Sequence, residues 1–162
     1  MSTSNTGRWL EADIEKAAKA YEDRKVATLS KVDPPTLRIG GKTIFKANPF
    51  LDFVGCWRGA AIFIEAKSTA EPKLSICSGS SSGITPKQYE SLHRWARAKA
   101  VTFVLWGHAG EIRLVLLSQL TERINAGVKH LKWEEAHKIE PGNGWVRFDF
   151  LSCYLRLLRA TE

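Results

Sequence analysis

Residues 51–69, LDFVGCWRGAAIFIEAKST, constrain the fold more than any other part of this sequence. The stretch 59–64 is small and apolar, which is typical of a strand buried in a sheet. The run then continues into Glu65, Ala66 and Lys67 instead of further apolar residues. Burying either charge without a partner costs on the order of several kcal/mol. This segment therefore predicts a buried strand that ends in charged side chains with a specific partner.

The spacing within the segment predicts what that partner is. If the chain turns on Arg58 and Gly59 alone, Asp52 lies opposite Glu65, with the two Cβ atoms about 4.5–5.5 Å apart. Lys67 is two residues beyond Glu65, so its side chain leaves the same face of the sheet. A turn longer by one residue would make the contact between the carboxylates diagonal. The hairpin thus predicts an Asp–Glu pair with a lysine beside it.

Two carboxylates pressed together repel each other, and unless a cation joins them the pKa of one carboxyl rises. Mg²⁺ takes oxygen ligands at about 2.0–2.1 Å, and the main-chain carbonyl of Ala66 lies between the two side chains as a third ligand. Lys67 would then lie beside the metal, where it could steer the attacking water or offset negative charge building on phosphorus. The alternative is a solvated surface cluster in which Glu65 and Lys67 are only neighbours on one face. We favour the metal site because an apolar strand leads into it and a basic hairpin precedes it.

The whole chain predicts an α/β sandwich with a mixed sheet, organised as one domain over 1–162. A stripe of apolar residues at helical spacing predicts a first helix over 8–24. A basic hairpin over 36–47 turns on Gly40 and Gly41, and the catalytic core spans 50–117. Within this core we expect a flexible loop over 70–85, a helix from Pro86, and strands over 101–106 and 112–117. The C-terminal part, 118–162, is expected to hold helices over 118–126 and 133–139 and a terminal segment over 145–159.

Charge and composition limit the classes of partner that this chain is expected to bind. The chain has 24 Lys and Arg against 17 Asp and Glu, a formal net charge of +7, which favours a polyanionic partner. No run approaches the roughly 20 apolar residues of a membrane span, and no secretory signal opens the chain, so we expect a cytoplasmic protein with no membrane partner. Cys56, Cys77 and Cys153 are read as small apolar residues of a reduced protein. The SGSSSG stretch lacks the features of a P-loop, so we expect no nucleotide cofactor.

The arrangement Asp52…Glu65-Ala66-Lys67 resembles the PD-(D/E)xK nuclease superfamily, and within it the Holliday-junction resolvases of the RecU type. The resemblance extends beyond the acidic pair. An amino-terminal pattern matches Asn5, Gly7, Leu10, Glu11 and Ile14, and later elements match Tyr21, Lys31 to Pro35, Asp52-Phe53-x-Gly55, Gln88 and Leu92. Thr6 departs from the arginine usual in that pattern, and Phe50 and Leu51 replace hydroxyl residues usual before the aspartate.

This resemblance implies a restriction-endonuclease-like sandwich, with a mixed central sheet flanked by helices and a protruding basic hairpin. It implies a Mg²⁺-dependent, homodimeric endonuclease, with Mn²⁺ as a substitute, in a prokaryotic cell or a phage-infected host. Such an enzyme recognises four-way DNA junctions by shape and nicks two strands symmetrically. By position, Glu11 joins Asp52 and Glu65 as a metal ligand, and Gln88 joins the catalytic group.

The family resemblance also indicates which residues contact DNA. The hairpin around Gly40 corresponds to a stalk that engages the junction centre, and DNA-binding roles are expected for Arg8, Lys31, Arg38, Lys42 and Lys46. The three cations of the hairpin could instead only protect its edges from aggregation. Two other functions stay open at this point. One is a nuclease of the same fold acting on flaps, ends or duplex sites, and the other is a module that binds branched DNA without cleaving it.

Overall fold

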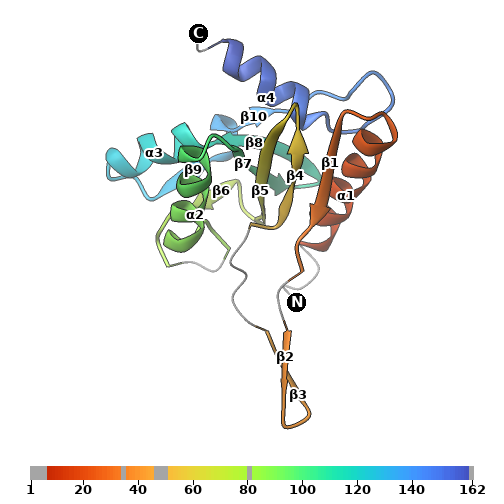
Figure 1. The fold of residues 1–162 in the computed structure, drawn as a ribbon. Coiled ribbons are helices and arrows are strands. Elements are labelled where there is room, and N and C mark those ends of the chain that lie inside the picture. The colour runs from red at the N-terminus through yellow and green to blue at the C-terminus, as the bar shows by residue number, and fades with distance from the viewer. Residues whose placement is uncertain (1–6, 34–35, 46–50, 80–81, 161–162) are drawn as a thin grey trace.

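The computed structural model describes residues 7–33, 36–45, 51–79 and 82–160, which form a sheet flanked by helices with a hairpin that projects from it (Figure 1). The first half contains α1 (Arg8–Asp23), β1 (Ala27–Lys31), β2 (Thr36–Ile39), β3 (Lys42–Phe45), β4 (Phe53–Trp57), β5 (Ala60–Ser68) and β6 (Lys73–Ser75). The second half contains α2 (Pro86–Arg97), β7 (Val101–His108), β8 (Glu111–Leu116), α3 (Leu117–Asn125), β9 (His130–Lys132), the 3₁₀ helix η1 (Trp133–Glu135), β10 (His137–Lys138) and α4 (Phe150–Arg159).

The central sheet has six strands in the order β1-β4-β5-β7-β8-β10. β5 and β7 pair in parallel, and the other neighbours pair antiparallel. The parallel pair lies in the middle, where β7 is buried along nearly its whole length, as expected for a strand covered on both faces. The predicted α/β sandwich with a mixed sheet is confirmed.

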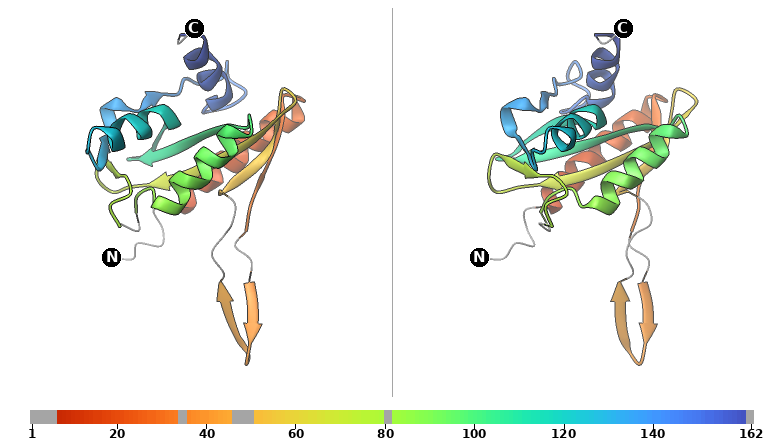
Figure 2. Two further views of the ribbon diagram at one scale, coloured as in Figure 1. Left: turned by 60° about the vertical axis from the view of Figure 1, so that its left-hand side comes forward. Right: turned by 90° about the vertical axis from the view of Figure 1, so that its left-hand side faces the viewer.

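Helices cover both faces of the sheet, and alternate residues of each strand supply the two cores. Ile62 and Ile64 of β5 pack in a cluster with apolar residues of α1 and α4. Phe63, between them, packs in the other cluster with residues of α2, α3, β6 and β9. The residue after Ile64 therefore projects toward the α2 side, because successive side chains of a strand point to opposite faces. Figure 2 shows these two layers from other directions.

The β4–β5 hairpin has the predicted register. Arg58 and Gly59 form its two-residue turn, with φ of 53° and 80°, as a type I′ turn requires. The paired residues run from Trp57 opposite Ala60 to Phe53 opposite Ile64. The next position of this register sets Asp52 opposite Glu65, so the geometric premise of the sequence analysis is confirmed.

The predicted basic hairpin is also present. β2 and β3 pair around Gly40 and Gly41, whose φ values are 57° and 77°. The hairpin projects from the body of the molecule (Figures 1 and 2), and Arg38 and Lys42 on it are exposed. Lys46 lies outside the described residues.

Several expected elements were wrong. Residues 70–85 are not a plain flexible loop: β6 pairs with β9, and Leu74, Ile76 and Ile84 are buried. Their burial anchors the segment, although Ser80 and Ser81 lie outside the described residues. The helix expected over 133–139 is η1 followed by β10, because the chain there joins the edge of the sheet.

Other parts of the chain also differ from the expectation. β1 was not predicted, and the end of the terminal segment, which was expected without a secondary structure, is the helix α4. The three cysteines are free. Cys153 is buried in one core cluster and Cys77 is half-buried against the other, whereas Cys56 is exposed and does not behave as a core residue. In the part of the chain that the structure describes, every helix is too short or too polar to cross a membrane.

Candidate active site

Asp52 and Glu65 lie side by side at the start of β4, where β5 extends beyond the end of its partner strand. β4 reaches only as far as the position opposite Ile64, whereas β5 extends to Ser68. The Ala66 N–H, which has no β4 residue opposite it, donates to Asp52 Oδ2 at 2.8 Å. The Asp52 carbonyl accepts from the Val32 N–H, also at 2.8 Å. Asp52 is thus held by the backbone on both sides and faces the end of β5.

The two carboxyl groups perturb each other. Glu65 is only 2% exposed, and burial, reinforced by the charge of Asp52, raises the pKa of Glu65 to about 8, although Lys67 opposes the rise. Burial also raises the pKa of Asp52, against the hydrogen bond from Ala66 and the charge of Lys67. A hydrogen bond from protonated Glu65 to Asp52 raises the pKa of Glu65 further and lowers the pKa of Asp52. The protein without a bound cation therefore keeps Glu65 mostly protonated near neutral pH.

Lys67 lies with the acidic pair as predicted. Its Nζ is 3.1 Å from Glu65 Oε1, and its side chain is 14% exposed. Both residues leave β5 on the same face, toward α2. A lysine in this position places a positive charge beside the two carboxylates and stays accessible to a substrate at the surface.

Gln88 is also brought into this group. It lies in the first turn of α2, which packs over the face from which Glu65 projects. Gln88 Nε2 donates to Glu65 Oε1 at 2.5 Å. The sequence analysis placed Gln88 here through the resemblance alone, and the structure gives the contact.

Glu11 does not join the pair directly. It lies on α1, on the opposite face of the sheet, and its Oε2 is 2.7 Å from Lys31 Nζ. Its charge still contributes to the raised pKa of Asp52, so it lies near the pair. Over residues 7–33, 36–45, 51–79 and 82–160, no three acidic, histidine or cysteine side chains lie close enough to hold a metal ion. Lys31, expected to contact DNA, is engaged with Glu11.

The donor set nevertheless fits a hard divalent cation. In an extended strand the N–H and C=O of one residue point to the same neighbour, so the Ala66 carbonyl points toward Asp52, as its N–H does. Asp52, Glu65 and this carbonyl together offer only oxygen donors, as Mg²⁺ requires. The pKa of both carboxyl groups is raised, with Glu65 buried and Asp52 half-buried, so a cation between them would favour their charged forms.

Sequence reasoning overlooked Thr85. Thr85 and Gln88 form a capping box at the start of α2: the Gln88 N–H donates to Thr85 Oγ1 at 3.2 Å, and the Thr85 N–H donates to Gln88 Oε1 at 2.9 Å. The signal was present in the sequence, because Thr-x-x-Gln before a helix is the capping-box pattern. Its connection to Glu65 could not be seen without the fold.

The expected DNA-contacting residues lie elsewhere on the surface. Arg8 is exposed at the start of α1, and Arg38 and Lys42 are exposed on the hairpin. None of these three makes an ion pair with a described residue. They remain available to a polyanion.

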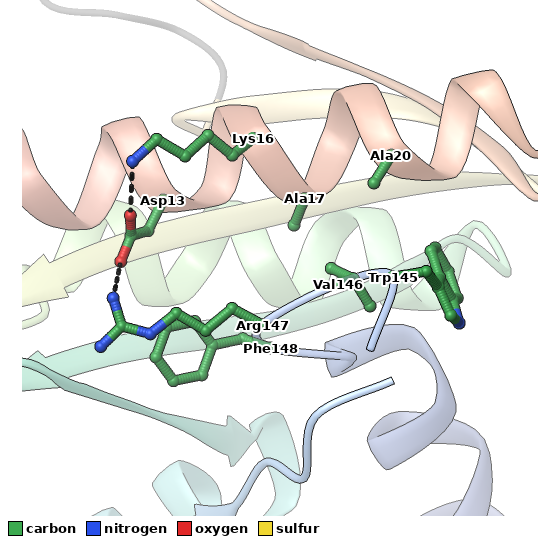
Figure 3. A pocket seen from close by; sticks show the side chains of 8 residues that line it. All are labelled: Asp13, Lys16, Ala17, Ala20, Trp145, Val146, Arg147 and Phe148. Atoms are coloured by element: carbon green, nitrogen blue, oxygen red, sulfur yellow. Dashed lines mark hydrogen bonds and ion pairs between the residues drawn. The ribbon is translucent and has the colours of Figure 1, made fainter. Parts of the chain in front are cut away.

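A cavity of about 260 Å³ lies between α1 and residues 145–148 (Figure 3). At its rim, Asp13 contacts Lys16 Nζ at 3.2 Å and Arg147 Nη1 at 3.3 Å. Ala17 and Trp145 line it further in. It lies on the α1 side of the sheet, whereas Glu65 projects toward α2, and it is not part of the acidic site.

An aspartate beside a Glu-x-Lys strand end, in a mixed sheet covered by helices, is the arrangement of a PD-(D/E)xK nuclease. A family model described as recombination protein U (RecU) matches residues 5–143 of this chain. The chain therefore belongs to the recombination protein U family of Holliday-junction resolvases. Membership places it among the nucleases of DNA recombination, with branched DNA as the partner, and confirms the resemblance read from the sequence.

A search of curated protein sequences finds no significant match. Among solved structures, the chain is similar to Hjc from Archaeoglobus fulgidus, a Holliday junction resolvase from an archaeal hyperthermophile. The two are 18% identical with a TM-score of 0.46, over 69% of this chain and 73% of that chain.

Proposed function

We propose that this protein is a Mg²⁺-dependent, structure-selective endodeoxyribonuclease that resolves four-way DNA junctions by paired symmetrical nicks. The observation that carries the proposal is the hairpin register that sets Asp52 against Glu65 and Lys67, in a chain of this family. Oxygen donors and a lysine at one strand end suit the hydrolysis of a phosphodiester, whose transition state gathers negative charge.

Asp52, Glu65 and the Ala66 carbonyl would hold the cation, with Glu11 as a further ligand once it separates from Lys31. Bound there, Mg²⁺ or Mn²⁺ supplies Lewis-acid chemistry for phosphodiester hydrolysis. Lys67 Nζ lies 3.1 Å from Glu65 Oε1, beside the proposed cation site, where it would offset charge that develops on the scissile phosphate. Gln88 donates to Glu65 and holds that carboxylate in place.

Binding is proposed to depend on the DNA backbone and on the shape of the junction. A net charge of +7 and the exposed cations Arg8, Arg38 and Lys42 suit phosphate contacts, which position a duplex without reading its sequence. Paired symmetrical cuts need two active sites, because one chain carries one acidic pair. We therefore propose that the active form is a homodimer.

The decisive substitution is Asp52→Asn. Asparagine keeps the shape of the side chain and an oxygen that can accept from the Ala66 N–H, but it loses the charge that a cation needs. We expect cleavage of a labelled four-way junction to be abolished and junction binding to stay nearly unchanged. A variant that cuts normally in Mg²⁺ would show that the site is misassigned.

The same assay separates the proposal from other functions. The wild-type protein is incubated with a four-way junction, a flap and a linear duplex, first with Mg²⁺ and then with EDTA. Paired nicks on the junction that disappear in EDTA support the proposal. Preferential cutting of the flap or the duplex would indicate a nuclease with another substrate, and binding without any cleavage would indicate a junction-binding module.

A further inference from the structure

We propose that Thr85 is a positioning residue for the catalytic group, acting by fixing the side-chain amide of Gln88 so that its NH₂ end faces Glu65. This inference rests on the proposed function of the Asp52–Glu65 site and adds a residue to it. Thr85 does not touch the acidic pair. It acts through the capping box at the start of α2.

The two ends of the Gln88 amide have different chemistry and different partners. Oε1 accepts from the Thr85 N–H at 2.9 Å, and Nε2 donates to Glu65 Oε1 at 2.5 Å. A backbone N–H can only donate, so only the oxygen end of the amide can face Thr85. The NH₂ end is therefore directed at Glu65. A rotated amide would turn its NH₂ end toward the Thr85 N–H, donor against donor, and leave that N–H without its acceptor, which is costly.

Thr85 itself is held firmly. It precedes Pro86, and a residue before proline is restricted to extended conformations, as its φ of −76° and ψ of 158° show. Its Oγ1 accepts from the Gln88 N–H, which closes the capping box from the other side. The extended conformation of Thr85 thus directs both its N–H and its hydroxyl oxygen toward Gln88.

The segment before Thr85 is bound to β6. The Ile84 N–H donates to the Ser75 carbonyl at 2.9 Å, and the Cys77 N–H donates to the Ile84 carbonyl at 2.8 Å. The backbones are so close at this point that a Cβ on Gly83 would lie 2.4 Å from the Ser75 oxygen. Gly83 and Ile84 are therefore fixed against β6, and they hold Thr85 beside Gln88.

The glutamine of α3 provides a matched control. Gln119 also occupies the third position of its helix, where its Oε1 accepts from the Leu116 N–H at 2.9 Å and its Nε2 donates to the Glu135 carbonyl at 2.7 Å. The same side-chain geometry occurs there without a carboxylate of the acidic pair. A substitution at Gln119 therefore measures how cleavage responds to the loss of a capping glutamine that does not contact the acidic pair.

The test compares Thr85→Val, Thr85→Ser and Gln119→Leu in the full-length protein. Thr85→Val changes the volume little and keeps the N–H that contacts Gln88 Oε1, but it removes the hydroxyl that accepts from the Gln88 N–H. Without this acceptor the first turn of α2 is no longer held against Thr85 and the amide loses its fixed position. We therefore expect single-turnover junction cleavage to slow by roughly 10- to 100-fold, as for other supports of active-site ligands. Junction affinity should stay within about twofold, since binding depends on backbone phosphate contacts elsewhere. Thr85→Ser restores the acceptor and should restore the rate, and Gln119→Leu should cleave at the wild-type rate.

A second readout does not depend on cleavage. The side-chain NH₂ resonances of Gln88, followed by NMR in protein without metal, should shift in Thr85→Val and stay in place in Thr85→Ser. Unshifted resonances in Thr85→Val, an unchanged cleavage rate, or equal slowing by Gln119→Leu would each overturn the inference. If the valine variant does not fold, Thr85→Ala serves in the same comparison. Absence of junction cleavage by the wild-type protein would count against the proposed function, while the resonances would still report on the amide.

Discussion

Glu65 is a carboxyl residue whose burial in the fold disfavours the charged form that a cation site would use. Its position on β5 makes it almost fully buried, and its neighbour across the hairpin is another carboxyl group. Lys67 and Gln88 both contact its Oε1, yet the pKa of the carboxyl remains raised. The surroundings of Glu65 therefore favour its neutral form until further positive charge arrives.

This conflict predicts how stability depends on pH. The pKa of Glu65 is about 8 in the folded protein and close to its ordinary value of about 4.3 in the unfolded chain. The folded state therefore holds a proton that the unfolded chain has lost, and the free energy of unfolding falls as pH rises through this window. Glu65→Gln is neutral at every pH, so it should lose most of the slope.

The measurement is chemical denaturation of the protein without metal between about pH 5 and pH 8. Glu90→Gln, at an exposed carboxylate on α2, is the control and should keep the wild-type slope. A Glu65→Gln variant with an undiminished slope would show that other groups govern the pH dependence.

At the scale of elements, the approach of β1 to β4 depends on Gly55. A Cβ at this position would lie 1.8 Å from the Thr28 carbonyl oxygen and 2.9 Å from the Leu29 Cα, closer than any side chain allows. This close pairing also brings the chain after β1 to Asp52, whose carbonyl accepts from Val32. The glycine thus supports the site through the sheet, with no side chain of its own.

Gly55→Ala should therefore be strongly destabilising. Because backbone rather than a flexible side chain blocks the methyl group, we expect a loss of about 3 kcal/mol or more in the free energy of unfolding, beyond ordinary overpacking. Gly7→Ala is the control: its Cβ meets nothing within 4 Å, and its cost should stay below about 1 kcal/mol. Equal stability of the two variants, measured by denaturant titration, would mean that the strands can separate without cost.

The elements predicted from the sequence are those with a long pattern or a distinctive turn. α1 was predicted from its apolar stripe, and the two hairpins from Gly40–Gly41 and Arg58–Gly59. β1 was missed because only Ala27 and Leu29 of its five residues are buried. β9 and β10 are three and two residues long, too short to show a period, and tertiary pairing alone makes them strands.

The residues of the candidate site also fall into two groups: those predicted from local spacing and those that depend on the tertiary structure. Counting residues around the turn was enough to place Asp52 opposite Glu65, because the length of the turn sets the register of a hairpin. Gln88 and Glu11 were reached only through the family resemblance, since nothing in their own segments indicates which strand they approach. The pairing of Glu11 with Lys31 joins α1 to β1 and depends on the tertiary arrangement.

On the scale of the whole molecule, the β2–β3 hairpin is the part that extends furthest from the sheet (Figure 1). Its exposed cations, Arg38 and Lys42, have no acidic partner among the described residues. The body of the protein carries other exposed cations, such as Lys16 and Lys19, that are paired with aspartates. The positive charge of the hairpin is therefore not neutralised by any described acidic residue, and in the proposed function it is available to DNA.

Arg38→Ser combined with Lys42→Ser should weaken junction binding and lower the slope of log affinity against log salt by about 2, one for each lost phosphate contact. Lys16→Ser combined with Lys19→Ser removes the same charge from α1 and should change the slope little. Binding titrations over a range of salt concentrations give both values. A hairpin variant that aggregates but binds with the original slope would indicate that these cations protect the strand edges instead.

The turn at Arg58 and Gly59 lies at the far end of its hairpin, roughly 20 Å from the acidic pair at the usual rise of a strand. Exposed turns commonly tolerate inserted residues. Here one extra residue would slide β4 along β5 by a position and carry the Asp52 carboxylate toward the other face of the sheet. This turn is thus constrained in length as well as in its positive φ values, because the number of residues in it determines which residue of β5 lies opposite the aspartate.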